Sequence, residues 1–292
     1  MELFLQQVLA GIATGGIYAC MALALVMIFQ AIGALNFAQG EMAMFATFVC
    51  WQLLSWGAPY WVAFLLTIVI AFVGGVVIER IVLAPLRNAN ILSNIAAYIA
   101  LFVILNSLAG FIWDFTIKPF PSPFGTAPLF GSSLIGAHQA GMIVVTLAVL
   151  AFLFVFFTYT RIGLAMRAAA TNPASARLVG IRVGWMIALG WGLAASIGAI
   201  AGMLVAPVVF LEPNMMSNIL VYSFAGAVLG GLTSPAGAVV GGLLVGVIEN
   251  LAGTFIPVIG GELKLTIALS IIVAVLVWKP SGLFGRTLVS RV

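Results

Sequence analysis

The chain has 292 residues, of which 64% are hydrophobic and only 6% are charged, with a formal net charge of +4. A soluble domain carries about 25% charged residues, so this composition excludes a cytosolic enzyme, a secreted disulfide-stabilised domain and a nucleic-acid-binding protein. The mean hydropathy of +1.28 instead predicts a polytopic membrane protein. Backbone groups cannot stay unpaired in lipid and the sequence lacks period-2 alternation, so we expect it to be all-α.

Eight apolar regions follow one another along the chain. A membrane helix needs about 20 mostly apolar residues, and six stretches meet this requirement: 8–30, 37–56, 61–79, 91–113, 139–160 and 184–208. A seventh region, 219–250, is longer and is interrupted by the Gly and Pro residues of 230–235, which disfavour a continuous helix. The eighth, near 263–278, is short. The pattern therefore predicts about eight transmembrane helices, including a broken or re-entrant segment near 219–250.

The positions of the basic residues predict the orientation of the chain. Nine of the eleven Lys and Arg residues fall into three groups that follow the third, fifth and last spans: Arg80 and Arg87; Arg161, Arg167, Arg177 and Arg182; Lys279, Arg286 and Arg291. Basic loops stay in the cytoplasm, so we expect the N-terminus outside and the C-terminus cytoplasmic. Region 219–250 must then make no net crossing, either as two short crossings or as a re-entrant hairpin. The Pro-rich loop 114–138 would be external.

Polar residues inside the apolar regions are the candidates for a transport site, because such residues are rare in membranes. Asn36, Gln39 and Glu41 either line the translocation path or its cytoplasmic gate, or they cap the start of the second span. A second interruption lies late in the chain, at Gly230, Gly231, Ser234 and Pro235. Interrupted segments in both halves of a chain indicate a transport site, so we expect both groups at the path.

Two further acidic positions have plainer interpretations. Glu249 and Asn250 are expected to form a polar end of the interrupted region, and Glu79 is expected to pair with Arg80 at the membrane surface. Glycines recur four residues apart between 226 and 246. Such spacing allows helices to approach closely in lipid, which predicts a tightly packed interior or a subunit interface.

The basic loop at about 161–185 contains signals for a short helix. Asn172 suits the N-cap, Pro173 the first helical position and Gly180 the C-terminal stop, so we expect a helix over 173–179. Such a helix either docks on a cytoplasmic partner or belongs to an ordinary basic loop. The candidate coupling residues are Arg167, Asn172, Pro173, Arg177, Leu178 and Gly180.

Motifs for catalysis, metal binding or nucleotide binding are missing from the sequence. The single histidine, His138, lies at the edge of a span, and Cys20 and Cys50 lie in apolar runs. No GxxxxGK[ST] sequence occurs, so a Walker A nucleotide-binding loop is not expected. We therefore expect neither an enzyme nor a cofactor-binding protein.

Several segments together resemble one transporter family. These are Leu35-Asn36-Phe37-Ala38-Gln39-Gly40-Glu41, Pro85-Leu86-Arg87, Gly163-Leu164-Ala165-Met166-Arg167, Asn172-Pro173, Ala225 to Gly231, and Ser234-Pro235-Ala236-Gly237. In order and spacing they resemble the branched-chain amino acid ABC importer permeases, the LivH family, over nearly the whole chain.

The resemblance implies a single transmembrane permease domain, 1–292, in a bacterial inner membrane. It implies four kinds of partner: membrane lipid, a second permease, two cytoplasmic ATPases that bind ATP and Mg, and an extracytoplasmic binding protein for leucine, isoleucine and valine. The helix at 173–179 would dock into the ATPases. The alternatives are a urea or short-amide importer, a stand-alone secondary transporter or channel, and a scaffolding subunit.

Overall fold

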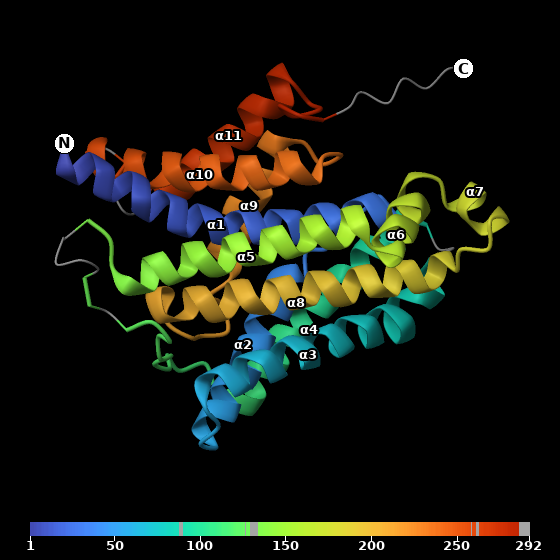
Figure 1. Cartoon of the computed structure of the whole chain (residues 1–292), viewed down its shortest axis with the longest axis horizontal. Coiled ribbons are helices and arrows are strands. Elements are labelled where there is room, and N and C mark those ends of the chain that lie inside the picture. The colour runs from blue at the N-terminus through green and yellow to red at the C-terminus, as the bar shows by residue number, and fades with distance from the viewer. Residues whose placement is uncertain (88–89, 126, 129–133, 258, 261–262, 286–292) are drawn as a thin grey trace. The chain divides into compact units, whose positions relative to one another are not determined.

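The computed structural model describes residues 1–87, 90–125, 127–128, 134–257, 259–260 and 263–285 (Figure 1). Within these ranges the chain is mainly helical, and the only β-type pairings are two isolated bridges. The helices are α1 (Glu2–Ile32), α2 (Gln39–Ser55), α3 (Tyr60–Ile78), α4 (Ile91–Trp113), α5 (Ala137–Tyr159), α6 (Arg161–Thr171), α7 (Pro173–Leu178), α8 (Val183–Val209), α9 (Ser217–Gly230), α10 (Pro235–Phe255) and α11 (Lys264–Trp278). A π-helical turn, Glu79–Leu83, and a 3-10 turn, Ala84–Leu86, extend α3.

Within the described parts of the chain, six helices are long and apolar enough to cross a membrane: α1, α3 with its extension, α4, α5, α8 and α10. The helices α2, α9 and α11 are apolar but shorter. The predicted all-α polytopic fold is therefore confirmed, and so is the interruption near 230–235, because α9 ends at Gly230 and α10 begins at Pro235. The number of crossings and the orientation of the termini stay predictions.

The chain forms two compact units, and the expected single domain stays a prediction. Unit one contains Met1–Val26, Phe124–Thr146 and Asn218–Val292, and unit two contains Met27–Pro123 and Leu147–Ser217.

In unit one, glycines bring α10 against α1 and α9. A Cβ atom on Gly11 would lie 2.7 Å from the Cα of Val247, and one on Gly226 would lie 2.6 Å from the Cα of Gly242. Real side chains do not tolerate such approaches, so only glycine permits this backbone contact between helices. The predicted close packing of the glycine-rich region is therefore internal to this unit.

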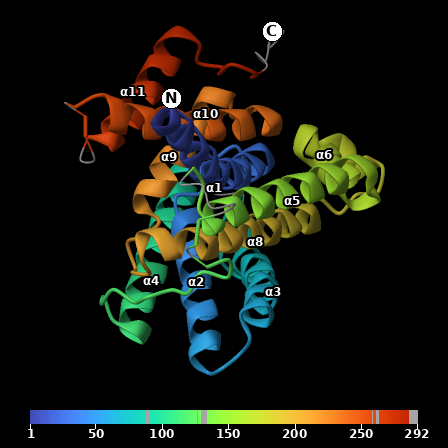
Figure 2. The same cartoon turned by 60° about the vertical axis from the view of Figure 1, so that its left-hand side comes forward.

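In unit two, α8 packs against α2 and α3 (Figure 2). A Cβ atom on Gly75 of α3 would lie 2.6 Å from the carbonyl oxygen of Trp191 on α8. Trp191 is fully buried and stacks on Tyr98 of α4, with ring centroids 6.1 Å apart. The close packing makes α8 the central helix of this unit, with most of its side chains buried.

Candidate functional site

The first candidate group fills a break between α1 and α2 in unit two. Asn36 and Gln39 are both fully buried. The Nδ2 atom of Asn36 donates to Oε1 of Gln39 at 3.4 Å, and Nε2 of Gln39 donates to the carbonyl oxygen of Ala194 at 2.9 Å. Asn36 Oδ1 accepts the N–H of Ala38 at 3.1 Å. Asn36 therefore stabilises the turn before α2, although the N-cap residue itself is Ala38, whose side chain makes no capping bond.

This break lies level with the middle of α8. Ala194, the partner of Gln39, lies roughly 16 Å from the beginning of a helix that is roughly 40 Å long at 1.5 Å per residue. The helix α2 therefore begins at about half the depth of α8 instead of at one of its ends. Discontinuous helices with polar groups at this depth are typical of transport sites. A role of Asn36 and Gln39 in the path stays a prediction.

Glu41, in the first turn of α2, is 1% exposed and contacts an asparagine that sequence reasoning missed. Nδ2 of Asn106, on α4, lies 3.2 Å from Oε2 of Glu41. The same nitrogen lies 3.1 Å from the carbonyl oxygen of Pro213 and 3.2 Å from Oδ1 of Asn214. An asparagine within an apolar span is itself a signal of this kind, so Asn106 could have been selected from the sequence. Its partners could not.

The second candidate group forms the break between α9 and α10 in unit one. Ser234 is the N-cap of α10, and its Oγ accepts the N–H of Gly237 at 3.1 Å. Pro235 occupies the first helical turn. A backbone N–H at this position would have no partner within the helix, so its absence in proline costs nothing. Gly231 has a φ angle of +108°, which disfavours any residue with a side chain. The four residues Gly230, Gly231, Ser234 and Pro235 therefore form one turn, as predicted.

A segment near the C-terminus closes this break. The N–H groups of Leu283 and Phe284 donate to the carbonyl oxygens of Leu229 and Gly230 at 2.8 and 3.0 Å. The final carbonyls of a helix have no partners within the helix, so this segment satisfies two groups at the end of α9. Sequence reasoning did not find this interaction.

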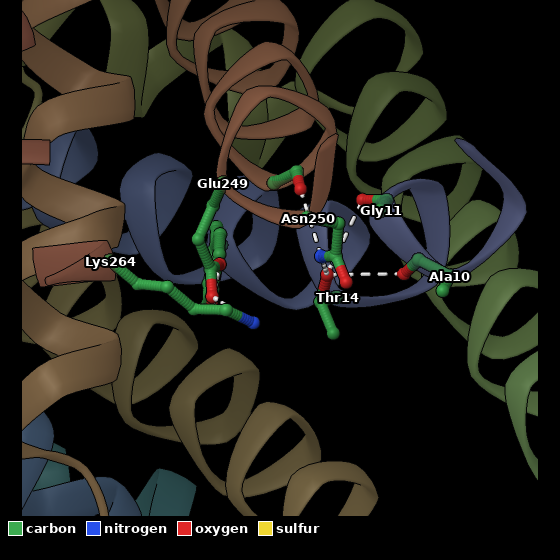
Figure 3. A network of polar contacts seen from close by, with 8 residues as sticks. Ala10, Gly11, Thr14, Glu249, Asn250 and Lys264 are labelled. Carbon is green, nitrogen blue, oxygen red and sulfur yellow. Dashed lines mark hydrogen bonds and ion pairs between the residues drawn. The ribbon is translucent and has the colours of Figure 1, made fainter. Parts of the chain in front are cut away.

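The third polar group surrounds Glu249 in unit one (Figure 3). The hydroxyl of Tyr18 donates to Glu249 Oε2 at 2.8 Å, and Lys264 Nζ lies 3.7 Å from Oε1. The neighbouring Asn250 donates to Thr14 Oγ1 at 2.9 Å. Glu249 is only 8% exposed, because α1 and α11 both contribute partners to its carboxylate. The expected position of this pair at a polar end of the interrupted region stays a prediction.

The end of α3 is joined to the start of α8 by charged groups. Glu79 is 1% exposed and pairs with Arg87, while Arg80 Nε lies 4.0 Å from its other oxygen. The Arg80 guanidinium lies 3.9 Å from the centroid of the Trp185 ring, a cation–π contact. The predicted pair of Glu79 with Arg80 is thus confirmed, and Arg87 is added to it.

The basic loop contains the predicted short helix. Helix α7 spans Pro173–Leu178, and Asn172 Oδ1 accepts the N–H of Ser175 at 3.0 Å, as an N-cap should. Gly180 has a φ angle of +84° just after the helix ends. The candidate residues Arg167 and Arg177 are exposed.

Two apolar side chains, at the last residue of α7 and just after it, are left exposed by the described residues of unit two. Ala169, Ala176 and Val183 form a small apolar cluster that holds α7 to α6 and α8. Figure 1 shows α7 beyond the end of α8. Leu178 is 88% exposed and Val179 is 76% exposed. The loop is therefore a structured element with an exposed apolar tip.

The comparisons with known proteins agree over nearly the whole chain. The family model described as "Branched-chain amino acid transport system / permease component" matches residues 7–277. The high-affinity branched-chain amino acid transport system permease protein LivH of Salmonella typhimurium is 31% identical, covering 99% of this chain and 98% of that protein. LivH of Escherichia coli K12 and BraD of Pseudomonas aeruginosa are 31% and 30% identical with the same coverage.

A solved structure shares the fold. PsaBC from Streptococcus pneumoniae in complex with Fab has a TM-score of 0.51 and 12% identity, covering 91% of this chain and 90% of that one. With its membrane-spanning helices and LivH-type relatives, the chain is a multi-pass inner-membrane protein. The chain belongs to the family of branched-chain amino acid transport system permease components.

Proposed function

We propose that this chain is the permease subunit of an ATP-driven importer that carries leucine, isoleucine and valine inward. The proposal rests on one observation. The alignments with permeases named for branched-chain amino acid transport cover nearly all of this chain and nearly all of each relative. A chain that shared only a membrane module with these proteins would match part of their length.

The proposed partners are a related second permease, two cytoplasmic ATPases and an extracytoplasmic binding protein. The exposed Leu178 and Val179 on a capped helix support docking of α7 into a groove on an ATPase. ATP and Mg would bind to those ATPases, and the permease itself would be no enzyme.

The proposed translocation path uses the two helix breaks. Asn36, Gln39 and Glu41 lie at one break and Gly230 to Pro235 at the other. Discontinuous helices in the two halves of a membrane protein are typical of transport sites. This supports a path role for both groups.

Transport by the purified complex tests the proposal. The complex that copurifies with this chain is reconstituted into proteoliposomes with ATP inside and the binding protein outside. We expect accumulation of labelled leucine, which excess isoleucine and valine suppress and which ADP does not support. Leucine uptake by this chain alone under an ion gradient would contradict the proposed importer. So would leucine uptake that urea and acetamide suppress and that isoleucine and valine do not.

Two variants test the coupling role of α7. Leu178→Asp places a charge on the apolar tip, and Asn172→Ala removes the cap, which is worth about 0.5–2 kcal/mol of local stability. Both should reduce leucine uptake at normal membrane abundance. Asn90→Ala is the matched control, because Asn90 caps α4 in the same way, by accepting the N–H of Ser93, and should leave uptake intact. Equal uptake in all three variants would exclude the docking role.

A further inference from the structure

Three carboxylates are buried in the described part of the chain, and they differ in their partners. Glu79 pairs with Arg87, and Glu249 pairs with Lys264. None of the ion pairs among the described residues involves Glu41, whose side chain instead accepts a hydrogen bond from the neutral amide of Asn106. Of these three buried carboxylates, Glu41 is therefore the one whose partner is a neutral hydrogen-bond donor and not a cation.

The oxygens around Asn106 Nδ2 could accept three hydrogen bonds, which is the number that an ammonium group can donate. Three oxygens lie 3.1–3.2 Å from this nitrogen: Oε2 of Glu41, the carbonyl oxygen of Pro213 and Oδ1 of Asn214. An amide nitrogen has two N–H donors, whereas an ammonium nitrogen has three. One of the three oxygens is therefore always without a hydrogen from Asn106.

We propose that Glu41, Pro213 and Asn214 bind the α-ammonium group of the transported amino acid, and that the Asn106 amide occupies this position when substrate is absent. The inference rests on the proposed function and deepens it, because it names the part of the substrate that is recognised.

The charge of Glu41 and the exposure of Asn214 both fit the binding of an ammonium group. A positive ligand would neutralise the Glu41 carboxylate in an environment where charges interact strongly. The start of α2 and the Asn106 amide stabilise the carboxylate while the site is empty. Glu41 is buried but Asn214 is exposed, so the oxygens extend from the surface of unit two to its interior.

The same chemistry separates amino acids from uncharged substrates. Urea and short amides offer NH2 groups like the one that Asn106 already provides. They would leave the charge of Glu41 unmatched and would gain little by displacing Asn106. The site therefore favours ligands that carry a primary ammonium group.

Direct binding to the purified complex, without the binding protein, tests the site independently of transport. The probes are 3-methylbutylamine, which has the ammonium group and the aliphatic chain of leucine, and 4-methylpentanoate, which has the carboxylate and the chain. In saturation-transfer NMR, the amine signal should be stronger with the wild-type complex than with Glu41→Gln, and the carboxylate signal should be equal in both. An amine signal that Glu41→Gln leaves unchanged would overturn the assignment.

Leucine transport gives the second readout. Glu41→Gln should reduce the maximal uptake rate by about 10-fold or more, the effect of losing a charged hydrogen bond, after normalisation to membrane abundance. Asn214→Ala removes an exposed side chain whose Oδ1 lies 3.2 Å from Nδ2 of Asn106, and should reduce uptake several-fold. Glu212→Gln is the matched control on the same turn and should transport normally.

Normal uptake by both Glu41→Gln and Asn214→Ala would overturn the site, and so would an equal loss in Glu212→Gln. If wild-type proteoliposomes took up no leucine, the proposed function would fail, whereas the NMR comparison would still decide whether Glu41 holds an ammonium group.

Discussion

A buried carboxylate in a membrane protein needs donors or a cation from neighbouring helices, and Glu249 has both. Tyr18 on α1 donates to it, and Lys264 at the start of α11 lies beside it (Figure 3). The stem of Lys264 passes over Gly253, where a Cβ atom would collide with the lysine Cε. Glycine at 253 thus makes room for the cation that matches Glu249.

Removing this lysine should destabilise the protein. Lys264→Met leaves Glu249 buried without its cation, and should lower the free energy of unfolding by about 1–3 kcal/mol. The double variant Lys264→Met with Glu249→Gln should recover most of the loss, because no charge remains unmatched. Thermal unfolding in mild detergent measures both.

The control for this pair is Arg161→Met, which removes an exposed basic residue and should change stability by less than about 0.5 kcal/mol. A double variant that is less stable than Lys264→Met alone would contradict the explanation.

Sequence reasoning selected some of the polar residues and missed their partners. Asn36, Gln39 and Glu41 were identifiable because polar residues are rare in apolar runs. The pairing of Glu249 with Lys264, and of Glu41 with Asn106, depends on which helices become neighbours. That choice is made by tertiary packing, which one sequence does not specify.

Among the elements, those with local signals were predicted best. The expected helix at 173–179 appears as Pro173–Leu178, because its cap and its stop are encoded by Asn172 and Gly180. The depth at which α2 begins could not be predicted in this way. It follows from the contact between Gln39 and Ala194, which lie far apart in the sequence.

The close contact between α9 and α10 requires glycine at position 226. Gly226→Ala would place a Cβ atom 2.6 Å from the Cα of Gly242. The helices must then separate, which should destabilise the protein by about 1–3 kcal/mol. Thermal unfolding in detergent is the measurement.

Gly74→Ala is the matched control, and its expected effect on stability is opposite to that of Gly226→Ala. No neighbouring element lies within 4 Å of a Cβ at Gly74, in the C-terminal half of α3. Alanine is the better helix former by about 0.5–1 kcal/mol, so this variant should be as stable as the wild type or more so. A loss of stability in both variants alike would contradict the packing argument.

For the whole molecule, composition and hydropathy predicted the class of protein and nearly every helix. The orientation rests on the distribution of Lys and Arg, and the division into two units had no signal in the sequence. Such a division reflects which helices pack together, and α1 and α5 each contribute to both units.

Cysteine labelling in intact cells tests the orientation. The natural Cys20 and Cys50 are buried, so the background should be low. We expect a membrane-impermeant maleimide added outside to label Thr116→Cys, in the predicted external loop, and to label Ser175→Cys in α7 only after the membrane is opened. The reverse pattern would invert the predicted topology.

The contact between residues 283–284 and the end of α9 also has a consequence for biosynthesis. A chain leaves the ribosome with its N-terminal part first, so α9 and α10 are made before the segment that satisfies Leu229 and Gly230. Until translation reaches residue 284, both carbonyl groups lack those partners. The α9–α10 turn should therefore reach its final form only after residues 283 and 284 have been synthesised.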